Sequence, residues 1–267
     1  MSSSTIALPA IRPAYYEIAN LEIPKLLEGL PRGITVLDAG CGSGVHGAEI
    51  KRLHGHRVTG VDLSAASIVK ARTRIDEAHV GDVTRPEAYP FYGQAQFDVI
   101  VFSDILEHIC DPRDVVGRHL PLLRAGGRFL ISIPNIAIWN VRFGLLFGRF
   151  DYHETGTMDK THLRFFTQRT FREFAQAAGL RIVKQRPSPG VARAFVPLVK
   201  RLYERAGAVD GSPNSSSIME SGPYRFYTKW LYPIEAALCR LWPGMFTFQI
   251  VCLCEPVEGG DTCSQWP

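Results

Sequence analysis

Val36-Leu-Asp-Ala-Gly-Cys-Gly-Ser-Gly44 is the stretch that decides the fold, because an apolar run ends there in alternating glycines. The run begins at Ile34, and buried parallel strands are typically short, continuous apolar runs of this kind. Glycine allows a tight turn after the strand and lets a ligand approach the backbone closely. We expect a helix next, over residues 44–53. A strand, a glycine loop and a helix predict the first unit of an open α/β sheet.

Apolar runs then alternate with amphipathic segments along the chain. Further strands are predicted at 57–61, 78–80, 97–102, 128–133, 181–185 and 246–254, and helices at 15–30, 64–74, 112–123, 136–150 and 167–178. Ser64 and Thr167 are expected to cap two of these helices, and Gly179 to end one. The alternation predicts right-handed crossovers and a mostly parallel sheet. The chain divides into an N-terminal tail and helix (1–30), a core (31–186), a helical insertion (187–245), and a last strand with a tail (246–267).

The composition is that of an ordinary globular protein. The chain has 267 residues, of which 46% are hydrophobic and 21% charged, which argues against a disordered, collagen-like or coiled-coil protein. Six cysteines are too few for a disulfide scaffold, and no CxxC pair suggests a zinc site. Residues 1–10 lack the basic start and apolar core of a secretory signal. We therefore expect a reducing, cytoplasmic setting.

The net charge of +4 is distributed unevenly. Residues 140–250 hold 16 Lys or Arg against 8 Asp or Glu, a net charge of +8, whereas the remainder carries −4. A basic surface suits an anionic substrate, an anionic lipid headgroup or nucleic acid, and a solvated face with no partner is the alternative.

The acidic residues near the glycine loop indicate its ligand. Gly42-Ser-Gly44-Val-His-Gly47 matches the GxGxxG fingerprint of dinucleotide-binding proteins. However, Asp38 opens the loop, and a carboxylate is unfavourable beside a pyrophosphate. Asp62, about 20 residues further on, is placed to accept hydrogen bonds from ribose hydroxyls, and Asp82 from an adenine amino group. An adenosine with a cationic amino-acid tail fits this row better than a dinucleotide does.

Five segments resemble, in order, the motifs of class I S-adenosylmethionine (SAM)-dependent methyltransferases. They are Val36–Gly44, Gly60-Val-Asp-Leu-Ser64, Gly81-Asp-Val83, Phe97–His108 and Leu123-Arg-Ala-Gly-Gly-Arg-Phe-Leu130. The resemblance covers residues 30–185 and the last strand. It implies a Rossmann-like α/β fold with a seven-stranded, mostly parallel sheet of order 3-2-1-4-5-7-6, here with a helical cap or insertion before the last strand.

The resemblance also implies SAM as cofactor and names its contacts. They are Asp38, Gly40, Cys41 and Gly42 for the methionine portion, Asp62 for the ribose, Leu63, Asp82 and Val83 for the adenine, and Ser103 near the methionine end. Helix capping and surface solvation are the alternative roles for the three acids.

Two histidines are the candidate catalytic bases, since methyl transfer to a hydroxyl requires removal of a proton. His108 follows the fourth strand, where related sugar and small-molecule O-methyltransferases place a base. The spacing of Asp104, Glu107 and His108 also resembles a divalent-metal triad of ubiquinone-pathway O-methyltransferases, but we predict no metal. His162 lies between the fifth strand and the next helix. For each histidine, a structural role in a loop is the alternative.

The segments around His162 resemble a bacterial subgroup that accompanies glycosyltransferases. They are Ser132-Ile-Pro-Asn135, Gly148-Arg-Phe-Asp-Tyr152 and Asp159–Thr167. In the family this region, here 136–166, forms a lid over the acceptor. Asn135, Trp139 and Arg164 are the predicted substrate-binding residues. His162 and Arg164 alternate with Leu163 and Phe165, so we expect the polar pair and the apolar pair to face opposite ways.

Aromatic and basic residues alternate in segments 136–150 and 193–243. This composition is typical of interfacial membrane helices, of lids that exclude water, and of base-stacking surfaces, and a helical cap with its own small core is the fourth option. We predict a lid that touches a membrane as a peripheral protein does, and no nucleic acid, because no RNA-binding module accompanies the aromatic residues.

The resulting functional prediction is SAM-dependent O-methylation of a small-molecule or glycan hydroxyl. The alternatives are a quinone-pathway or natural-product methyltransferase and a catalytically silent SAM-binding partner protein. A dehydrogenase is suggested only by the GxGxxG match.

Overall fold

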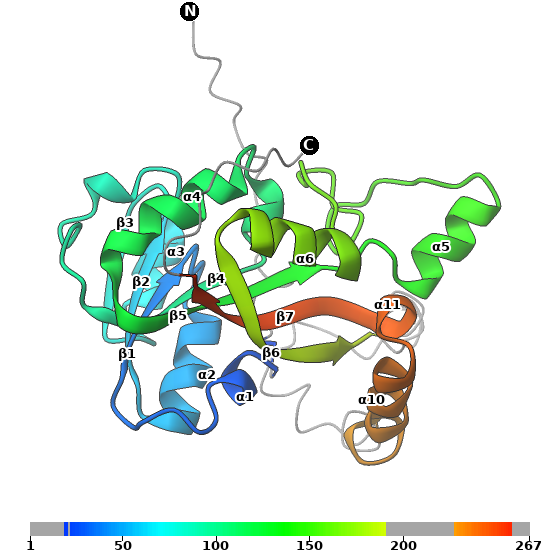
Figure 1. Cartoon of the computed structure of the whole chain (residues 1–267), viewed down its shortest axis with the longest axis horizontal. Coiled ribbons are helices and arrows are strands. Elements are labelled where there is room, and N and C mark those ends of the chain that lie inside the picture. The colour runs from blue at the N-terminus through cyan, green and yellow to red at the C-terminus, as the bar shows by residue number, and fades with distance from the viewer. Residues whose placement is uncertain (1–18, 21, 191–226, 258–267) are drawn as a thin grey trace, which may run out of the picture.

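Seven strands form one sheet in the order β3-β2-β1-β4-β5-β7-β6, as predicted (Figure 1). The computed structural model describes residues 19–20, 22–190 and 227–257. The strands are β1 (Thr35–Ala39), β2 (Arg57–Asp62), β3 (Glu77–Val80), β4 (Phe97–Ser103), β5 (Leu123–Pro134), β6 (Leu180–Pro189) and β7 (Thr247–Pro256).

Strands β3, β2, β1, β4 and β5 run parallel, and β7 is antiparallel to both β5 and β6. Asp38 of β1 pairs with Gly60 of β2 and Val101 of β4. This register brings the carboxyl ends of three strands to the same edge of the sheet. Ligands bind at that edge in open α/β sheets.

Helices cover both faces of the sheet because successive strand residues point to opposite sides. On one face, α1 (Glu22–Leu26), α2 (Val45–His54) and α3 (Ala65–Ala71) share a buried core with Val36. On the other, α4 (Pro112–His119) and α6 (Gln168–Ala177) share a second core with Leu37 and three fully buried phenylalanines, Phe102, Phe129 and Phe174.

The predicted helix ends at Ser64 and Thr167 are confirmed. The Ser64 hydroxyl accepts from the Ser67 amide, and Thr167 forms a reciprocal capping box with Thr170. Gly179 follows α6 with φ 67°, a left-handed conformation suited to glycine.

Several predicted bounds were wrong. The fifth strand starts at Leu123, not Arg128, and the sixth continues to Pro189, because β6 is an edge strand, where proline is tolerated. The helix predicted over 64–74 ends at Ala71, and that over 136–150 is reduced to α5 (Trp139–Leu146). Of the helix predicted over 15–30, the structure has α1, while residues 15–18 lie outside the described part.

The predicted insertion, 187–245, is described only in part, because residues 191–226 lie outside the described part. After them come a π-helical turn (Tyr227–Leu231), α10 (Tyr232–Leu241) and α11 (Pro243–Phe246), which precede β7. Short 3₁₀ turns lie at Pro86–Ala88, Leu106–His108 and Leu120–Leu122. Among the described residues, no helix has the length and apolar character needed to cross a bilayer.

Candidate active site

The glycine loop after β1 is built on left-handed backbone. Gly40, Gly42 and Gly44 have φ values of 83°, 52° and 79°, which glycine adopts without the steric cost of a Cβ. The amides of Gly40 and Cys41 both donate to the Val61 carbonyl, at 2.8 and 3.0 Å. A Cβ at Gly40 would lie 2.9 Å from the Ile105 side chain, whereas one at Gly42 would meet no atom within 4 Å. The loop is therefore closed toward β4 and open at Gly42.

Asp62, at the end of β2, holds this loop in place. One carboxylate oxygen accepts from the Gly42 amide at 2.8 Å and the other from the Ser64 amide at 2.8 Å. The next side chain, Leu63, is 61% exposed. Asp62 thus has a structural role in addition to the predicted ribose contact.

Asp38 is buried beneath the loop, with only 1% of its surface exposed, and neither carboxylate oxygen makes a regular hydrogen bond to the described part of the chain. Burial, and secondarily the charge of Asp62, raises the pKa of Asp38 to about 7, while the Gly47 amide acts in the opposite direction. An unpaired buried carboxylate of this kind favours a nearby cation.

The other predicted cofactor residues differ in exposure. Asp82 is half-buried and accepts from the amide and hydroxyl of Thr84, at 2.8 and 2.7 Å. Val83 and Ser103 are buried, and the Ser103 hydroxyl makes no hydrogen bond to the described residues. Burial also raises the pKa of the Cys41 thiol, which fits a loop residue and not a nucleophile.

Asp104, directly after β4, is directed away from the metal triad that the sequence suggested. It is the one described non-glycine residue with positive φ, at 52°. Its carboxylate accepts from Gln249 Nε2 at 2.7 and 2.6 Å, and Gln249 Oε1 accepts from Asn20 at 2.7 Å. Asp104 therefore ties the end of β4 to β7.

The two predicted catalytic histidines lie together beside Glu107. The rings of His108 and His162 are in edge-to-face contact, with centroids 4.7 Å apart. His162 Nε2 lies 3.9 Å from Glu107 Oε1. One potential ligand atom from each of the three side chains lies within 4.8 Å of the other two. The structure thus brings together residues that are 54 positions apart in the chain.

Backbone carbonyls fix the tautomers of both rings. His108 Nδ1 lies 3.2 Å from the Thr161 carbonyl, and His162 Nδ1 lies 3.2 Å from the Thr157 carbonyl. Because a carbonyl can only accept, each Nδ1 carries the proton and donates it. Each Nε2 therefore presents a lone pair, which can accept a proton or bind a cation.

Both histidine rings are uncharged near neutral pH. Burial lowers the pKa of His108, and burial together with His108 lowers the pKa of His162 to about 4. Burial, and secondarily Asp104, raises the pKa of Glu107 well above its usual range.

The comparisons with known proteins agree with this geometry. The model of a methyltransferase domain matches residues 12–185. The chain belongs to the methyltransferase domain family. The cofactor of such a domain is SAM, as the sequence predicted.

Curated relatives match part of this methyltransferase. Ubiquinone biosynthesis O-methyltransferase of Psychrobacter cryohalolentis is 33% identical over 108 residues, covering 39% of the chain and 42% of the relative. The protein of that name from Serratia proteamaculans is 35% identical over 104 residues, covering 38% and 43%. The chain thus spans about two fifths of the length of these relatives.

Solved structures share the fold at 16% sequence identity. A SAM-dependent methyltransferase from Archaeoglobus fulgidus has a TM-score of 0.54 and covers 87% of this chain and 90% of its own. Phosphoethanolamine N-methyltransferase 2 from Haemonchus contortus, in complex with SAM, has a TM-score of 0.55, covering 90% and 52%.

Two predicted substrate-binding residues of the methyltransferase are engaged in backbone contacts. Asn135 is fully buried and donates to the Thr247 carbonyl at 2.8 Å, so its amide holds the end of β5 against β7. Arg164 donates to the Cys110 carbonyl at 2.7 and 3.2 Å. Trp139 begins α5, half-buried, and contacts Phe143 edge to face.

The expected separation of polar and apolar side chains over 162–165 was wrong. The Phe165 ring contacts that of His162, with centroids 6.2 Å apart, whereas Leu163 is 54% exposed. The reason is that the segment is not an extended strand. The amides of Leu163 and Arg164 both donate to the Glu107 carbonyl, at 2.8 and 3.0 Å, so the chain curls over the turn after β4.

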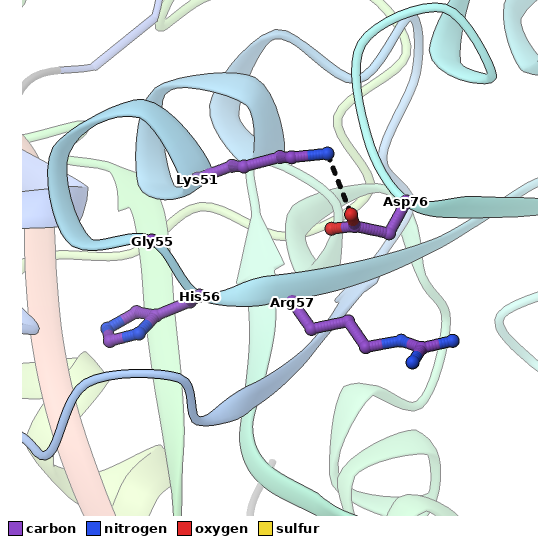
Figure 2. A pocket seen from close by; sticks show the side chains of 5 residues that line it. All are labelled: Lys51, Gly55, His56, Arg57 and Asp76. Atoms are coloured by element: carbon purple, nitrogen blue, oxygen red, sulfur yellow. Dashed lines mark hydrogen bonds and ion pairs between the residues drawn. The ribbon is translucent and has the colours of Figure 1, made fainter.

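A surface depression of about 600 Å³ lies at the opposite end of the sheet (Figure 2). Its lining comprises Lys51, Gly55, His56, Arg57 and Asp76, and Lys51 pairs with Asp76 at 2.7 Å. Arg57 begins β2, whereas the glycine loop and Asp62 lie at the carboxyl ends of their strands. The depression is therefore separate from the candidate active site.

Three residues that hold the loops of the site in place were not predicted. Asp159 accepts from the amide and hydroxyl of Thr161, at 2.8 and 2.7 Å, and the Thr161 hydroxyl lies 3.1 Å from His108 Nδ1. The Asp-x-Thr spacing is a turn signal that could have indicated the first two. The third, Gln249, is a buried polar residue in a mostly apolar strand, which could have indicated it.

Proposed function

We propose that the protein transfers a methyl group from SAM to a hydroxyl of a small-molecule or glycan acceptor. The observation that carries this proposal is the pairing of an open glycine loop at the end of β1 with two neutral histidines, His108 after β4 and His162 in contact with it. Ile105, which lies against Gly40, connects the two parts.

The glycine loop fits the cofactor. The backbone at Gly42 has space for a ligand to approach, and the unpaired carboxylate of Asp38 supplies negative potential for the ammonium and sulfonium charges of SAM. Asp62 and Asp82 would hold the ribose and adenine, with Leu63 and Val83 beside the base. When bound, SAM supplies an electrophilic methyl group.

The histidines supply the acid–base function. His108 Nε2 is oriented as a proton acceptor, because Thr161 binds Nδ1–H. When the ring takes up the acceptor's proton, the Asp159 carboxylate stabilises the resulting imidazolium by its negative charge. His162 occupies a matching position and is the second candidate base.

Two acceptor classes are supported by different observations. The glycan acceptor rests on the resemblance of 132–135, 148–152 and 159–167 to the subgroup that accompanies glycosyltransferases. A quinone-pathway acceptor rests on the relatives named ubiquinone biosynthesis O-methyltransferase. A screen of sugars, nucleotide-sugars and catechols for methyl incorporation separates the two.

The membrane contact predicted for 136–150 and 193–243 is part of the proposal. Residues 193–226 lie outside the described part, so support comes from α5 and α10. Leu146, the last residue of α5, and Phe147, which follows it, are 74% and 76% exposed, and Leu241 at the end of α10 is 83% exposed. Large apolar side chains that are this exposed are typical of an interaction surface when they gather in one region.

Titration calorimetry with SAM, S-adenosylhomocysteine and NAD tests the cofactor first. We expect micromolar binding of the two sulfur nucleosides and none of NAD. In His108→Ala and His162→Ala we expect SAM affinity to persist while turnover falls by about 10²–10⁴-fold in the variant that loses the base. Full turnover in both variants would refute the base assignment, and SAM binding without turnover of any acceptor class would favour a silent partner protein.

A further inference from the structure

We propose that Glu107, His108 and His162 form a binding site for a divalent transition-metal ion of the Zn²⁺, Fe²⁺ or Co²⁺ type. This ligand set differs from the triad suggested by the sequence, Asp104, Glu107 and His108, because His162 replaces Asp104. The site is argued from the ligands alone. A metal bound there occupies the Nε2 atoms of His108 and His162, so the metal-bound form is distinct from the form in which one of these histidines accepts a proton.

The three ligand atoms lie close enough to converge on one ion. They lie within 4.8 Å of one another, and the His162 Nε2 to Glu107 Oε1 distance is 3.9 Å. Ligands at about 2.1 Å from a tetrahedral ion are roughly 3.4 Å apart. Closing the difference requires only small side-chain rotations around a fixed backbone.

The Glu107 carboxylate provides evidence for a bound cation that is independent of the ligand distances. Its side chain is 99% buried, and neither carboxylate oxygen makes a hydrogen bond to the described part of the chain. Asp104 and Asp159 add charge of the same sign nearby. An unpaired buried carboxylate requires a proton or a cation, and the two adjoining imidazoles make a cation the better match.

The two rings have the tautomer that metal ligands require. In each, Nδ1–H donates to a backbone carbonyl, of Thr161 in one case and Thr157 in the other, and Nε2 is left as the ligand atom. Metal-binding histidines usually donate their second nitrogen to a carbonyl or carboxylate in this way. Asp159 extends the arrangement by holding Thr161.

The ligand chemistry selects the metal. Imidazole suits zinc, iron and cobalt, whereas Mg²⁺ and Ca²⁺ prefer oxygen ligands. Asp104, which would have supplied a second carboxylate, is instead held by Gln249. Three protein ligands leave a coordination position for water or a substrate oxygen, as in catalytic zinc sites.

The test is a titration of the untagged, chelator-treated full chain with Co²⁺, followed by visible absorption. We expect one equivalent to bind with the absorption of a four- or five-coordinate site, to be displaced by Zn²⁺, and not to be displaced by millimolar Mg²⁺. Metal occupancy and proton acceptance use the same Nε2 lone pairs, so binding and not turnover is the readout.

Variants identify the ligands. His162→Ala and Glu107→Gln should weaken Co²⁺ binding at least tenfold, with circular dichroism confirming that each is folded. His153→Ala removes an exposed histidine from the same segment and should bind as the wild type does. Asp104→Asn should also keep wild-type affinity. If Glu107→Gln does not fold, the comparison of Co²⁺ affinity between His162→Ala and His153→Ala tests the site.

Three outcomes overturn the proposal. They are no binding at millimolar Co²⁺ or Zn²⁺, equal affinity for Mg²⁺, and a loss of affinity in Asp104→Asn that is as large as in His162→Ala. None of these results bears on SAM binding, so the proposed function is tested separately.

Discussion

At the scale of single residues, Asp38 is the strongest indicator of a cationic ligand. Its folded pKa of about 7 lies above the value of 3.8 expected in the unfolded chain. The folded state therefore binds more protons between these pH values, and stability falls as pH rises from 3.8 to 7. Fully ionised, the carboxylate destabilises the ligand-free fold by up to about 4 kcal/mol.

We therefore predict that Asp38→Asn stabilises the ligand-free protein and weakens SAM binding. The melting temperature without SAM should exceed that of the wild type at pH 8, with a smaller gain at pH 5. The dissociation constant for SAM should rise at least tenfold. Thermal melts and calorimetry at both pH values measure the two effects, and a variant that is less stable than wild type at pH 8 would contradict the pKa assignment.

Gly42 and Gly44 form a matched pair for the cofactor loop, since both have left-handed backbone. A Cβ at Gly44 would lie 3.1 Å from the Ala71 backbone, whereas one at Gly42 would enter open space. We expect Gly44→Ala to lower the free energy of unfolding by about 2–3 kcal/mol, and Gly42→Ala by about 1 kcal/mol. SAM affinity should fall mainly in Gly42→Ala. Denaturant unfolding and calorimetry check this, and equal SAM losses would argue against a ligand at Gly42.

At the scale of elements, α4 carries a pH-dependent contribution to stability. His119 is fully buried, donates from Nδ1 to the Val115 carbonyl at 2.8 Å, and contacts Phe102 edge to face. Burial lowers its pKa to about 4 from 6.5. The unfolded chain binds more protons between these values, so stability falls as pH drops below 6.5.

We predict that His119→Leu removes this part of the pH dependence. Between pH 7 and pH 5, the wild-type free energy of unfolding should decrease by about 2 kcal/mol more than that of the variant. Denaturant titrations at both pH values provide the comparison. Parallel pH curves for the two proteins would show that His119 is not buried in its neutral form.

The elements also show what a sequence can predict. The sheet order was implied by the resemblance to class I methyltransferases, and the motifs that carry this resemblance lie at strand ends. Strand and helix ends were less predictable because they depend on partners. Strand β6 can include Pro187 and Pro189 because it is an edge strand, which pairs with β7 on one side and, among the described residues, with no strand on the other.

In the candidate site too, some residues could be placed from the sequence, whereas contacts between distant segments could not. Asp38 and Asp62 could be placed from the sequence because they lie at the carboxyl ends of their strands. The contact between His108 and His162 could not, because it depends on the 157–164 segment curling over the turn after β4. Likewise, the reorientation of Asp104 depends on Gln249, 145 residues later.

At the scale of the whole molecule, basic and apolar exposed residues gather at one end. Figure 1 shows α5 and α11 at the end of the sheet far from β3. The exposed apolar side chains there are Phe143, Leu145, Leu146, Phe147, Trp230, Ile234, Leu241 and Trp242. The exposed basic ones are Arg142, Arg149, Lys229 and Arg240. This combination suits an anionic membrane surface, where apolar burial and charge attraction act together.

We predict that the protein binds anionic lipid vesicles and that binding weakens with salt, because exposed charges are screened. Leu146→Ser and Leu241→Ser should each weaken binding about tenfold, since burial of a leucine side chain contributes about 1.5–3 kcal/mol. Leu53→Ser is the matched control, because Leu53 is a partly exposed leucine of α2 on a distant part of the fold. Co-sedimentation with vesicles of phosphatidylglycerol and phosphatidylcholine gives the affinities. Equal losses in all three variants, or equal binding to neutral vesicles, would show that this end of the molecule is not a membrane surface.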